Sequence, residues 1–163
     1  MVRVDQAGEY GATRIYAGQL AVLGTNGPGS RDIAHMLAQE ERHLASFNTE
    51  MARSGARPTA LQPFWHFAGF ALGAVTAAMG PRAAMACTAA VETEIDRHYS
   101  AQLSALGEHD PPLSAAIAEF QVEELEHRDH AINAGAEATP GYPFLSAVIR
   151  VGCRAAIRLA ERI

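Results

Sequence analysis

Two motifs of the sequence place a glutamate and a histidine three residues apart. Glu40 and His43 form the first Glu-x-x-His motif, and Glu124 and His127 form the second. Residues three apart on a helix project from one face, so each motif can present a carboxylate and an imidazole to one metal ion. A lone motif of this kind in a helix is more often a surface pair, so its meaning depends on what accompanies it.

The repeat includes one further glutamate upstream of each motif. Glu9 lies 31 residues before Glu40, and Glu92 lies 32 residues before Glu124. Taken alone, Glu9 could be a first-turn glutamate that the helix dipole favours. The matched order in the two halves instead predicts two helix hairpins, each of which contributes one glutamate and one Glu-x-x-His motif.

This set of side chains matches the one with which ferritin-like bundles hold two iron or manganese ions. Four carboxylates buried in a bundle would repel one another and lose their hydration, whereas two divalent cations would neutralise them. Carboxylates and imidazoles suit iron or manganese, and the sequence offers no thiolate-rich site for zinc. We therefore predict a di-metal centre with six ligands: Glu9, Glu40, His43, Glu92, Glu124 and His127.

Other polar residues adjoin the predicted ligands in sequence. Glu41, Glu123 and Glu126 point about 100° or more away from the ligands on a helix, which predicts solvated surface acids. His130 follows His127 by one turn, and we leave it outside the ligand set.

The residues that would support the ligands are less determined by spacing. Tyr99 follows Glu92 by seven residues and so lies on nearly the same helix face. It could donate a hydrogen bond to a ligand, line a substrate cavity or be a core tyrosine. A metal-bound histidine usually donates its other N–H to a carboxylate or a carbonyl. Asp5, His98 and Asp129 lie close to ligands, but spacing does not decide which acid would accept that hydrogen bond.

Glycines and prolines divide the chain into about six segments of good helix formers with apolar spacings of three and four. The breaks lie at residues 26–29, 55–63, 80–81, 107–112 and 139–143. No stretch of useful length alternates as a strand would. We predict a single all-α domain over residues 1–163, a ferritin-like four-helix bundle of two hairpins plus two additional helices.

The first additional segment is apolar. Residues 64–80 carry one titratable side chain, His66, and a helix of this length would extend about 25 Å, short for a membrane span. Gly69, Gly73 and Ala77 form a ridge of small residues suited to close helix packing. The segment could be a buried core helix or lie in a membrane interface.

The second additional segment, residues 143–163, is basic. Its four arginines recur every four residues along one helix stripe: Arg150, Arg154, Arg158 and Arg162. Such a stripe suits an anionic lipid surface or a solvated edge of the bundle. We expect helices over about 62–80 and 143–163 to be the membrane-associating elements.

Net charge and cysteine content narrow the classes of function. A formal net charge of -5 argues against a general nucleic-acid binder. Cys87 and Cys153 form no CxxC pair and lie among small apolar residues, which is typical of buried thiols in a reducing compartment. No apolar signal segment follows Met1, so we expect no secretion.

Around these residues the sequence resembles the demethoxyubiquinone hydroxylases of ubiquinone biosynthesis. The resemblance covers nearly the whole chain, in the same order and spacing, through five segments: VDQAGEYGATRIYAGQLAVLG, QEERHLASFN, MACTAAVETEIDRHY, EELEHRDHA and GCRAAIRLAERI. The ligands of that family fall on the six residues predicted above. A histidine and a tyrosine near its site fall on His98 and Tyr99.

The resemblance implies a di-iron monooxygenase, a 3-demethoxyubiquinol 3-hydroxylase, that hydroxylates the ring of a polyprenylated quinol with O₂ and two electrons. His98 and Tyr99 would then be catalytic residues beside the metal ligands. NADH or the reduced quinol could supply the electrons, and the chain has no Rossmann fingerprint for a dinucleotide.

The resemblance also implies a peripheral membrane protein with a lipid-binding partner protein from the same pathway. We expect a bacterial form at the cytoplasmic face of the inner membrane, and a homo-oligomer stays open. Two other interpretations also stay open. A ferritin- or rubrerythrin-like iron-oxidising or iron-storage protein would share the ligands without needing the apolar and basic helices. A helical membrane scaffold without enzymatic activity would make the repeat an accident.

Overall fold

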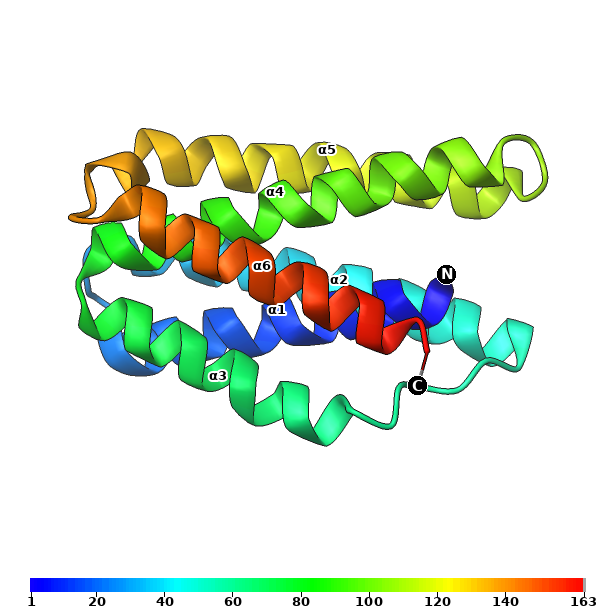
Figure 1. The fold of residues 1–163 in the computed structure, drawn as a ribbon, viewed down its shortest axis with the longest axis horizontal. Helices are drawn as coiled ribbons and strands as arrows, with labels where there is room; N and C mark the ends of the chain where they lie inside the picture. The colour runs from blue at the N-terminus through cyan, green and yellow to red at the C-terminus, as the bar shows by residue number, and fades with distance from the viewer. Residues whose placement is uncertain (163) are drawn as a thin grey trace.

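The helices begin and end at the glycines and prolines of the sequence. A computed structural model describes residues 1–162, and within them it contains only helices, turns and bends (Figure 1). The elements are α1 (Val2–Leu23), α2 (Ser30–Ser54), α3 (Gln62–Ala78), α4 (Pro81–Leu106), α5 (Pro111–Asn133), the 3₁₀ helix η1 (Ala136–Ala138) and α6 (Tyr142–Ala160). The predicted all-α, ferritin-like class is confirmed.

Prolines open several helices and glycines close them. Pro81 and Pro111 occupy the first turn of α4 and α5, where their missing N–H would have had no partner in the helix. Gly55 ends α2 in the left-handed region, with φ 67°, a conformation that costs a residue without Cβ little.

The two additional helices differ slightly from the predicted ranges. α3 ends at Ala78, before position 80, because Pro81 starts a new helix and disfavours helical backbone in the residue before it. α6 ends at Ala160. Residue 163, which the predicted helix and domain included, lies outside the described residues.

Two hairpins face each other in the bundle. α1 packs antiparallel to α2 and α4 packs antiparallel to α5, as the repeat predicted, while α3 connects the hairpins along the outside of α1 (Figure 1). α6 returns across α4. α4 therefore lies at the centre, and its residues 83–92 are all buried.

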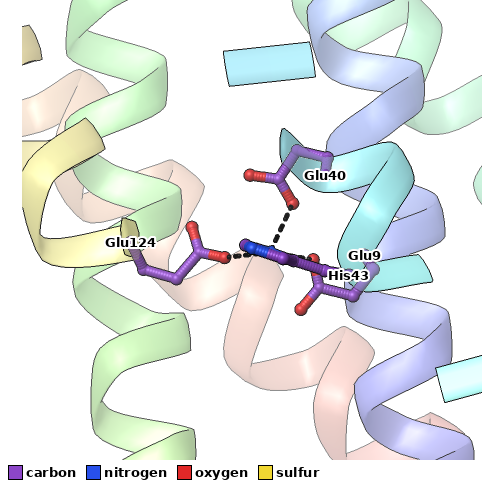
Figure 2. A group of neighbouring side chains, drawn as sticks. All are labelled: Glu9, Glu40, His43 and Glu124. Carbon is purple, nitrogen blue, oxygen red and sulfur yellow. Dashed lines mark hydrogen bonds and ion pairs between the residues drawn. The ribbon is translucent and has the colours of Figure 1, made fainter. Parts of the chain in front are cut away.

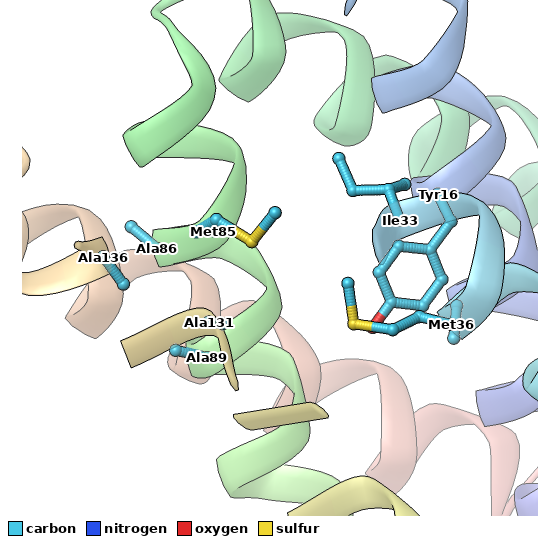
Figure 3. Packing of buried hydrophobic residues seen from close by; sticks show 9 residues of the cluster. Tyr16, Ile33, Met36, Met85, Ala86, Ala89, Ala131 and Ala136 are labelled. Carbon is cyan, nitrogen blue, oxygen red and sulfur yellow. The ribbon is translucent and has the colours of Figure 1, made fainter. Parts of the chain in front are cut away.

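The interior contains two kinds of side chain. Large residues of α1 and α2, such as Tyr16, Ile33 and Met36, fill the space opposite Met85 and a set of alanines on α4 and α5 (Figure 3). Small residues on the second hairpin let its helices approach closely, and burial of the large ones removes apolar surface from water.

Glycines fix α3 against α1. A Cβ atom on Gly73 would collide with the carbonyl oxygen of Ile15, and one on Gly18 would collide with the carbonyl oxygen of Phe70. The backbones of the two helices are therefore in direct contact, as the small-residue ridge predicted.

Candidate metal centre

The six predicted ligand residues gather in the middle of the bundle. Each of its four main helices contributes: α1, α2, α4 and α5. The side chains are all buried and form two groups, one of Glu9, Glu40, His43 and Glu124 and the other of Glu40, Glu92, Glu124 and His127. Within each group the candidate ligand atoms lie within 4.8 Å of one another.

The first group centres on the inner nitrogen of His43 (Figure 2). His43 Nδ1 lies 3.1 Å from Glu124 Oε1, 3.5 Å from Glu9 Oε2 and 4.0 Å from Glu40 Oε2. Three carboxylates from three helices therefore converge on one imidazole nitrogen.

The second group repeats this arrangement around His127. Its Nδ1 lies 3.3 Å from Glu40 Oε1 and 3.3 Å from Glu124 Oε2. Glu40 and Glu124 thus each turn one oxygen toward His43 and the other toward His127. A carboxylate in this position can bridge two cations, whereas Glu9 and Glu92 each belong to one group only.

Six polar atoms of the cluster lack hydrogen-bond partners. Glu9 Oε2, Glu92 Oε2, Glu124 Oε2, His127 Nδ1 and both carboxylate oxygens of Glu40 have no hydrogen-bond partner among the described residues. Buried polar atoms without partners are costly, and buried charges are normally paired or bound to metals. The donor set therefore fits two divalent cations better than it fits any protein partner.

Electrostatics in the metal-free cluster lead to the same conclusion. Burial, followed by the repulsion of Glu124 and other carboxylates, raises the pKa of Glu40 and of Glu92 well above the usual range. Burial lowers the pKa of His43, but the neighbouring carboxylates of Glu124 and Glu9 outweigh burial and raise the pKa to about 10. Protons therefore occupy the place that cations would take.

Glu124 is the exception among the carboxylates. Burial raises its pKa, but the neighbouring imidazoles of His127 and His43 outweigh burial and bring the pKa down to about 2. The carboxylate between the two histidines therefore stays ionised.

Two tyrosines donate hydrogen bonds to Glu9 and Glu92, the glutamates that each belong to only one of the two groups. Tyr16 Oη donates to Glu92 Oε1 at 2.6 Å, and Tyr99 Oη donates to Glu9 Oε1. Burial raises the pKa of both hydroxyls, so both stay protonated donors. Tyr16 was missed in the sequence, although it follows Glu9 by seven residues as Tyr99 follows Glu92. The catalytic role of Tyr99 stays a prediction.

His98 lies apart from the six ligands. Its Nε2 is 2.8 Å from Asp5 Oδ1, and Gln102 donates to the other Asp5 oxygen at 2.7 Å. The catalytic role predicted for His98 stays a prediction.

Glu123 is not the solvated surface acid that was predicted. Its side chain is 18% exposed and its Oε2 lies 2.9 Å from His43 Nε2. It also accepts hydrogen bonds from Arg42 and Gln39. Glu123 does point away from its own helix's ligands, but that direction faces α2 instead of solvent. Glu41 and Glu126 are exposed, as predicted.

The contacts of Glu123 keep it ionised. Partial burial raises its pKa, but hydrogen bonds from His43, Arg42 and Gln39 outweigh burial and lower the pKa. The carboxylate is therefore available as an acceptor for the outer nitrogen of His43.

An apolar cavity of about 380 Å³ lies between α1, α3, α4 and α6. Glycine, alanine and branched aliphatic residues form most of its wall, including Gly8 and Val91, the sequence neighbours of two ligands. Among the described residues of the wall, Glu94 is the one that carries a charge. The cavity can therefore accommodate an apolar ligand beside the helices that carry the metal cluster.

The arginine stripe of α6 is divided. Arg150 and Arg154 turn toward the protein and donate to Glu94 Oε1 at 2.6 and 2.7 Å. Arg158 and Arg162 are exposed. Half of the stripe that was expected to face lipid or solvent therefore binds a buried carboxylate.

Comparison with known proteins gives the family. The model for ubiquinone biosynthesis protein COQ7 matches residues 1–160. The 3-demethoxyubiquinol 3-hydroxylase of Rhodospirillum rubrum is 54% identical over 162 residues, which cover 99% of this chain and 76% of that protein. The mitochondrial NADPH-dependent 3-demethoxyubiquinone 3-hydroxylase of Homo sapiens is 50% identical over 167 residues, which cover 100% and 76%.

A more distant relative agrees with these two. The mitochondrial 5-demethoxyubiquinone hydroxylase of Saccharomyces cerevisiae is 40% identical over 179 residues, which cover 100% of this chain and 77% of that protein. These matches confirm the family resemblance predicted from the motifs. The chain belongs to the family of the ubiquinone biosynthesis protein COQ7.

Proposed function

We propose that this protein is a 3-demethoxyubiquinol 3-hydroxylase that uses two iron ions and O₂. The observation that carries the proposal is the buried cluster of four glutamates and two histidines, in a chain 54% identical to a hydroxylase of that name. One oxygen atom of O₂ would enter a ring C–H bond. The other would leave as water with two electrons and two protons.

Six residues would hold the metal. His43 and Glu9 would hold one ion, His127 and Glu92 would hold the other, and Glu40 and Glu124, which belong to both groups, would help to hold both. The iron ions, when bound, would supply the activation of O₂ that amino-acid side chains cannot provide. The four carboxylates would balance the four positive charges of two iron(II) ions.

The surrounding side chains would keep these ligands in place. Tyr16 and Tyr99 donate to one oxygen of Glu92 and Glu9, which leaves the other oxygen of each free to bind metal. Such outer hydrogen bonds fix the direction of a ligand and adjust its basicity.

The apolar cavity would receive the substrate. A polyprenylated quinol is largely hydrocarbon, and the cavity wall between α1, α3, α4 and α6 is almost entirely apolar. Both additional helices also carry exposed apolar side chains, including Phe64 and Phe67 on α3 and Phe144, Val148 and Val151 on α6. These helices would lie on a lipid surface and admit the quinol between them.

The proposal also covers membrane attachment, the electron source and the partners of the protein. No helix in residues 1–162 is both long and apolar enough to cross a membrane. From the exposed apolar side chains of α3 and α6 we propose peripheral attachment, at the cytoplasmic face of a bacterial inner membrane. NADH or the reduced quinol would supply electrons; several relatives are named NADPH-dependent. A lipid-binding partner protein and self-association remain proposals.

The alternative function, iron storage, would not require the apolar cavity.

Ring hydroxylation tests the proposal directly. Iron(II)-loaded protein is given a short-tailed demethoxyubiquinone analogue, NADH and ¹⁸O₂, and the product is weighed by mass spectrometry. We expect product carrying one ¹⁸O atom from the wild type and from Glu126→Ala, an exposed position on the same helix. Glu124→Ala should give none. Equal product from all three proteins would exclude the proposed centre, and unlabelled product would exclude O₂ as the source of the inserted oxygen atom.

A further inference from the structure

The outer nitrogens of the two histidines have different acceptors. His43 Nε2 lies 2.9 Å from Glu123 Oε2, and His127 Nε2 lies 3.1 Å from Gln39 Oε1. Both inner nitrogens face the carboxylates of the centre. Each imidazole therefore connects the metal cluster to one outer group, a carboxylate in one case and an amide carbonyl in the other.

The internal repeat relates these two acceptors. Gln39 directly precedes Glu40, and Glu123 directly precedes Glu124, so the two acceptors occupy equivalent positions 84 residues apart. Each accepts from the histidine of the opposite hairpin. The two hairpins therefore place their acceptors symmetrically, but one acceptor is a carboxylate and the other is an amide.

Contacts between the two acceptors preserve the difference. Gln39 Nε2 donates to Glu123 Oε2 at 2.8 Å, so the amide must turn its oxygen toward His127. Arg42 donates to both oxygens of Glu123, at 3.1 and 2.9 Å. The position equivalent to Arg42 in the second half is the exposed Glu126, which supplies no cation.

We propose that Glu123 and Gln39 are positioning residues that make the two metal sites unequal, the His43 site being the stronger. A carboxylate draws the N–H proton of an imidazole more strongly than an amide does, which makes the inner nitrogen a better metal donor. The inference rests on the proposed metal centre. It adds that the two ions bind in order, and that the network His43–Glu123–Gln39–His127 connects their sites.

Stepwise metal binding tests this order. Metal-free protein is titrated with iron(II) under argon by calorimetry, and Mössbauer spectra of ⁵⁷Fe(II) samples are recorded at one and two ions per chain. We expect two unequal binding steps and two distinct quadrupole doublets in the wild type. Glu123→Gln should weaken the tighter step by about 10-fold or more and bring the two steps together.

A double exchange supplies the decisive variant. Gln39→Glu with Glu123→Gln keeps one amide, one carboxylate and the hydrogen bond between them, but gives the carboxylate to His127. We expect two unequal steps again, with the order of the doublets reversed. Glu126→Gln makes the same change of charge at an exposed position on the same helix and should leave both steps unchanged.

Four results would overturn the inference. Equal steps in the wild type, or a Glu123→Gln protein that titrates like Glu126→Gln, would remove the asymmetry. A folded double variant, checked by circular dichroism, that does not restore unequal steps would show that Glu123 only supports the fold. Wild-type protein that binds no iron would overturn the metal centre as well. Product formation by a protein with two equal steps would leave the proposed function standing.

Discussion

At the scale of single residues, protons in the metal-free centre occupy the positions at which the proposed metal ions would bind. In the metal-free protein, burial raises the pKa of Glu40 and Glu92, and the neighbouring carboxylates hold the pKa of His43 at about 10. Two divalent cations must displace these protons before they can bind. Metal binding and pH are therefore linked through a few side chains.

The first prediction concerns the stability of the metal-free protein. Raised pKa values of Glu40 and Glu92 stabilise the fold fully below their ordinary value of 4.5 and progressively less as the pH rises. His43 acts in the same direction between 6.5 and about 10. Glu124, with its pKa of about 2, acts oppositely, but only as the pH falls below 4.5.

We therefore expect the Tm of metal-free protein to fall as the pH rises from about 6 to about 9. The Tm of protein loaded with iron(II) under argon should change less, so the gap between the two should widen. Calorimetric scans across this range provide the measurement. A gap that is constant or narrows with rising pH would contradict the protonated cluster.

A second prediction concerns Tyr16. The substitution Tyr16→Phe removes the donor to Glu92 Oε1 and leaves that buried oxygen without a partner. Because the hydrogen bond lowers the pKa of Glu92, its loss should let a proton compete better with metal. We expect about a 10-fold loss of iron affinity, measured by competition with a chelator, and none for Tyr142→Phe on α6. Equal affinities would mean that Tyr16 contributes packing alone.

Some of these residues could be predicted and others could not. The gathering of the six proposed ligands follows from a repeat, because helical spacing fixes which side chains share a face. Tyr16 could have been found by applying the Glu92–Tyr99 spacing to Glu9. The role of Glu123 could not, because it depends on α5 lying beside α2, and the 100° rule describes one helix without its neighbours.

At the scale of elements, the breaks between helices were predictable and the docking of α6 was not. Glycine and proline act on local backbone, so residues 26–29 or 107–112 interrupt helices in any fold. Arg150 and Arg154 turn inward because Glu94 on α4 is buried beside them. The spacing of arginines along one helix cannot reveal this contact, because the contact depends on a residue of another helix.

The third prediction concerns this contact. Glu94 is buried and also lies 3.6 Å from Arg97, so Glu94→Gln removes the charge that holds three arginines. The arginines are partly exposed and can be hydrated, so we expect a loss of only about 1–2 kcal/mol in the free energy of unfolding. Urea unfolding would measure it, and amide hydrogen exchange should accelerate in α6. Exchange no faster than in the control Glu161→Gln would contradict the anchoring role.

At the scale of the whole molecule, the two additional helices border one apolar cavity and present apolar side chains outward. Phe67 is 72% and Phe144 78% exposed, and the exposed Arg158 and Arg162 add positive charge at the C-terminal end of α6 and just beyond it. Exposed aromatic residues beside basic ones suit an anionic lipid surface. The cavity would then open where a lipid-soluble quinol is concentrated.

The fourth prediction tests this surface. Phe67→Ser with Phe144→Ser should reduce flotation with vesicles that contain anionic lipid, because each aromatic side chain loses its apolar contact with the bilayer. Val122→Ser changes a similarly exposed apolar residue on α5 and should float as the wild type does. Equal flotation of all three proteins would place the lipid contact elsewhere.

The central claim is that two iron ions on this cluster drive ring hydroxylation. The most direct measurement is a single-turnover experiment in which metal-free protein receives increasing iron(II), followed by reductant, O₂ and the short-tailed demethoxyubiquinone analogue. Bound iron and hydroxylated product are counted per chain in each sample. We expect product to rise with iron and to level off at two ions per chain. Product that levels off at one ion, or no product with two ions bound, would contradict the claim.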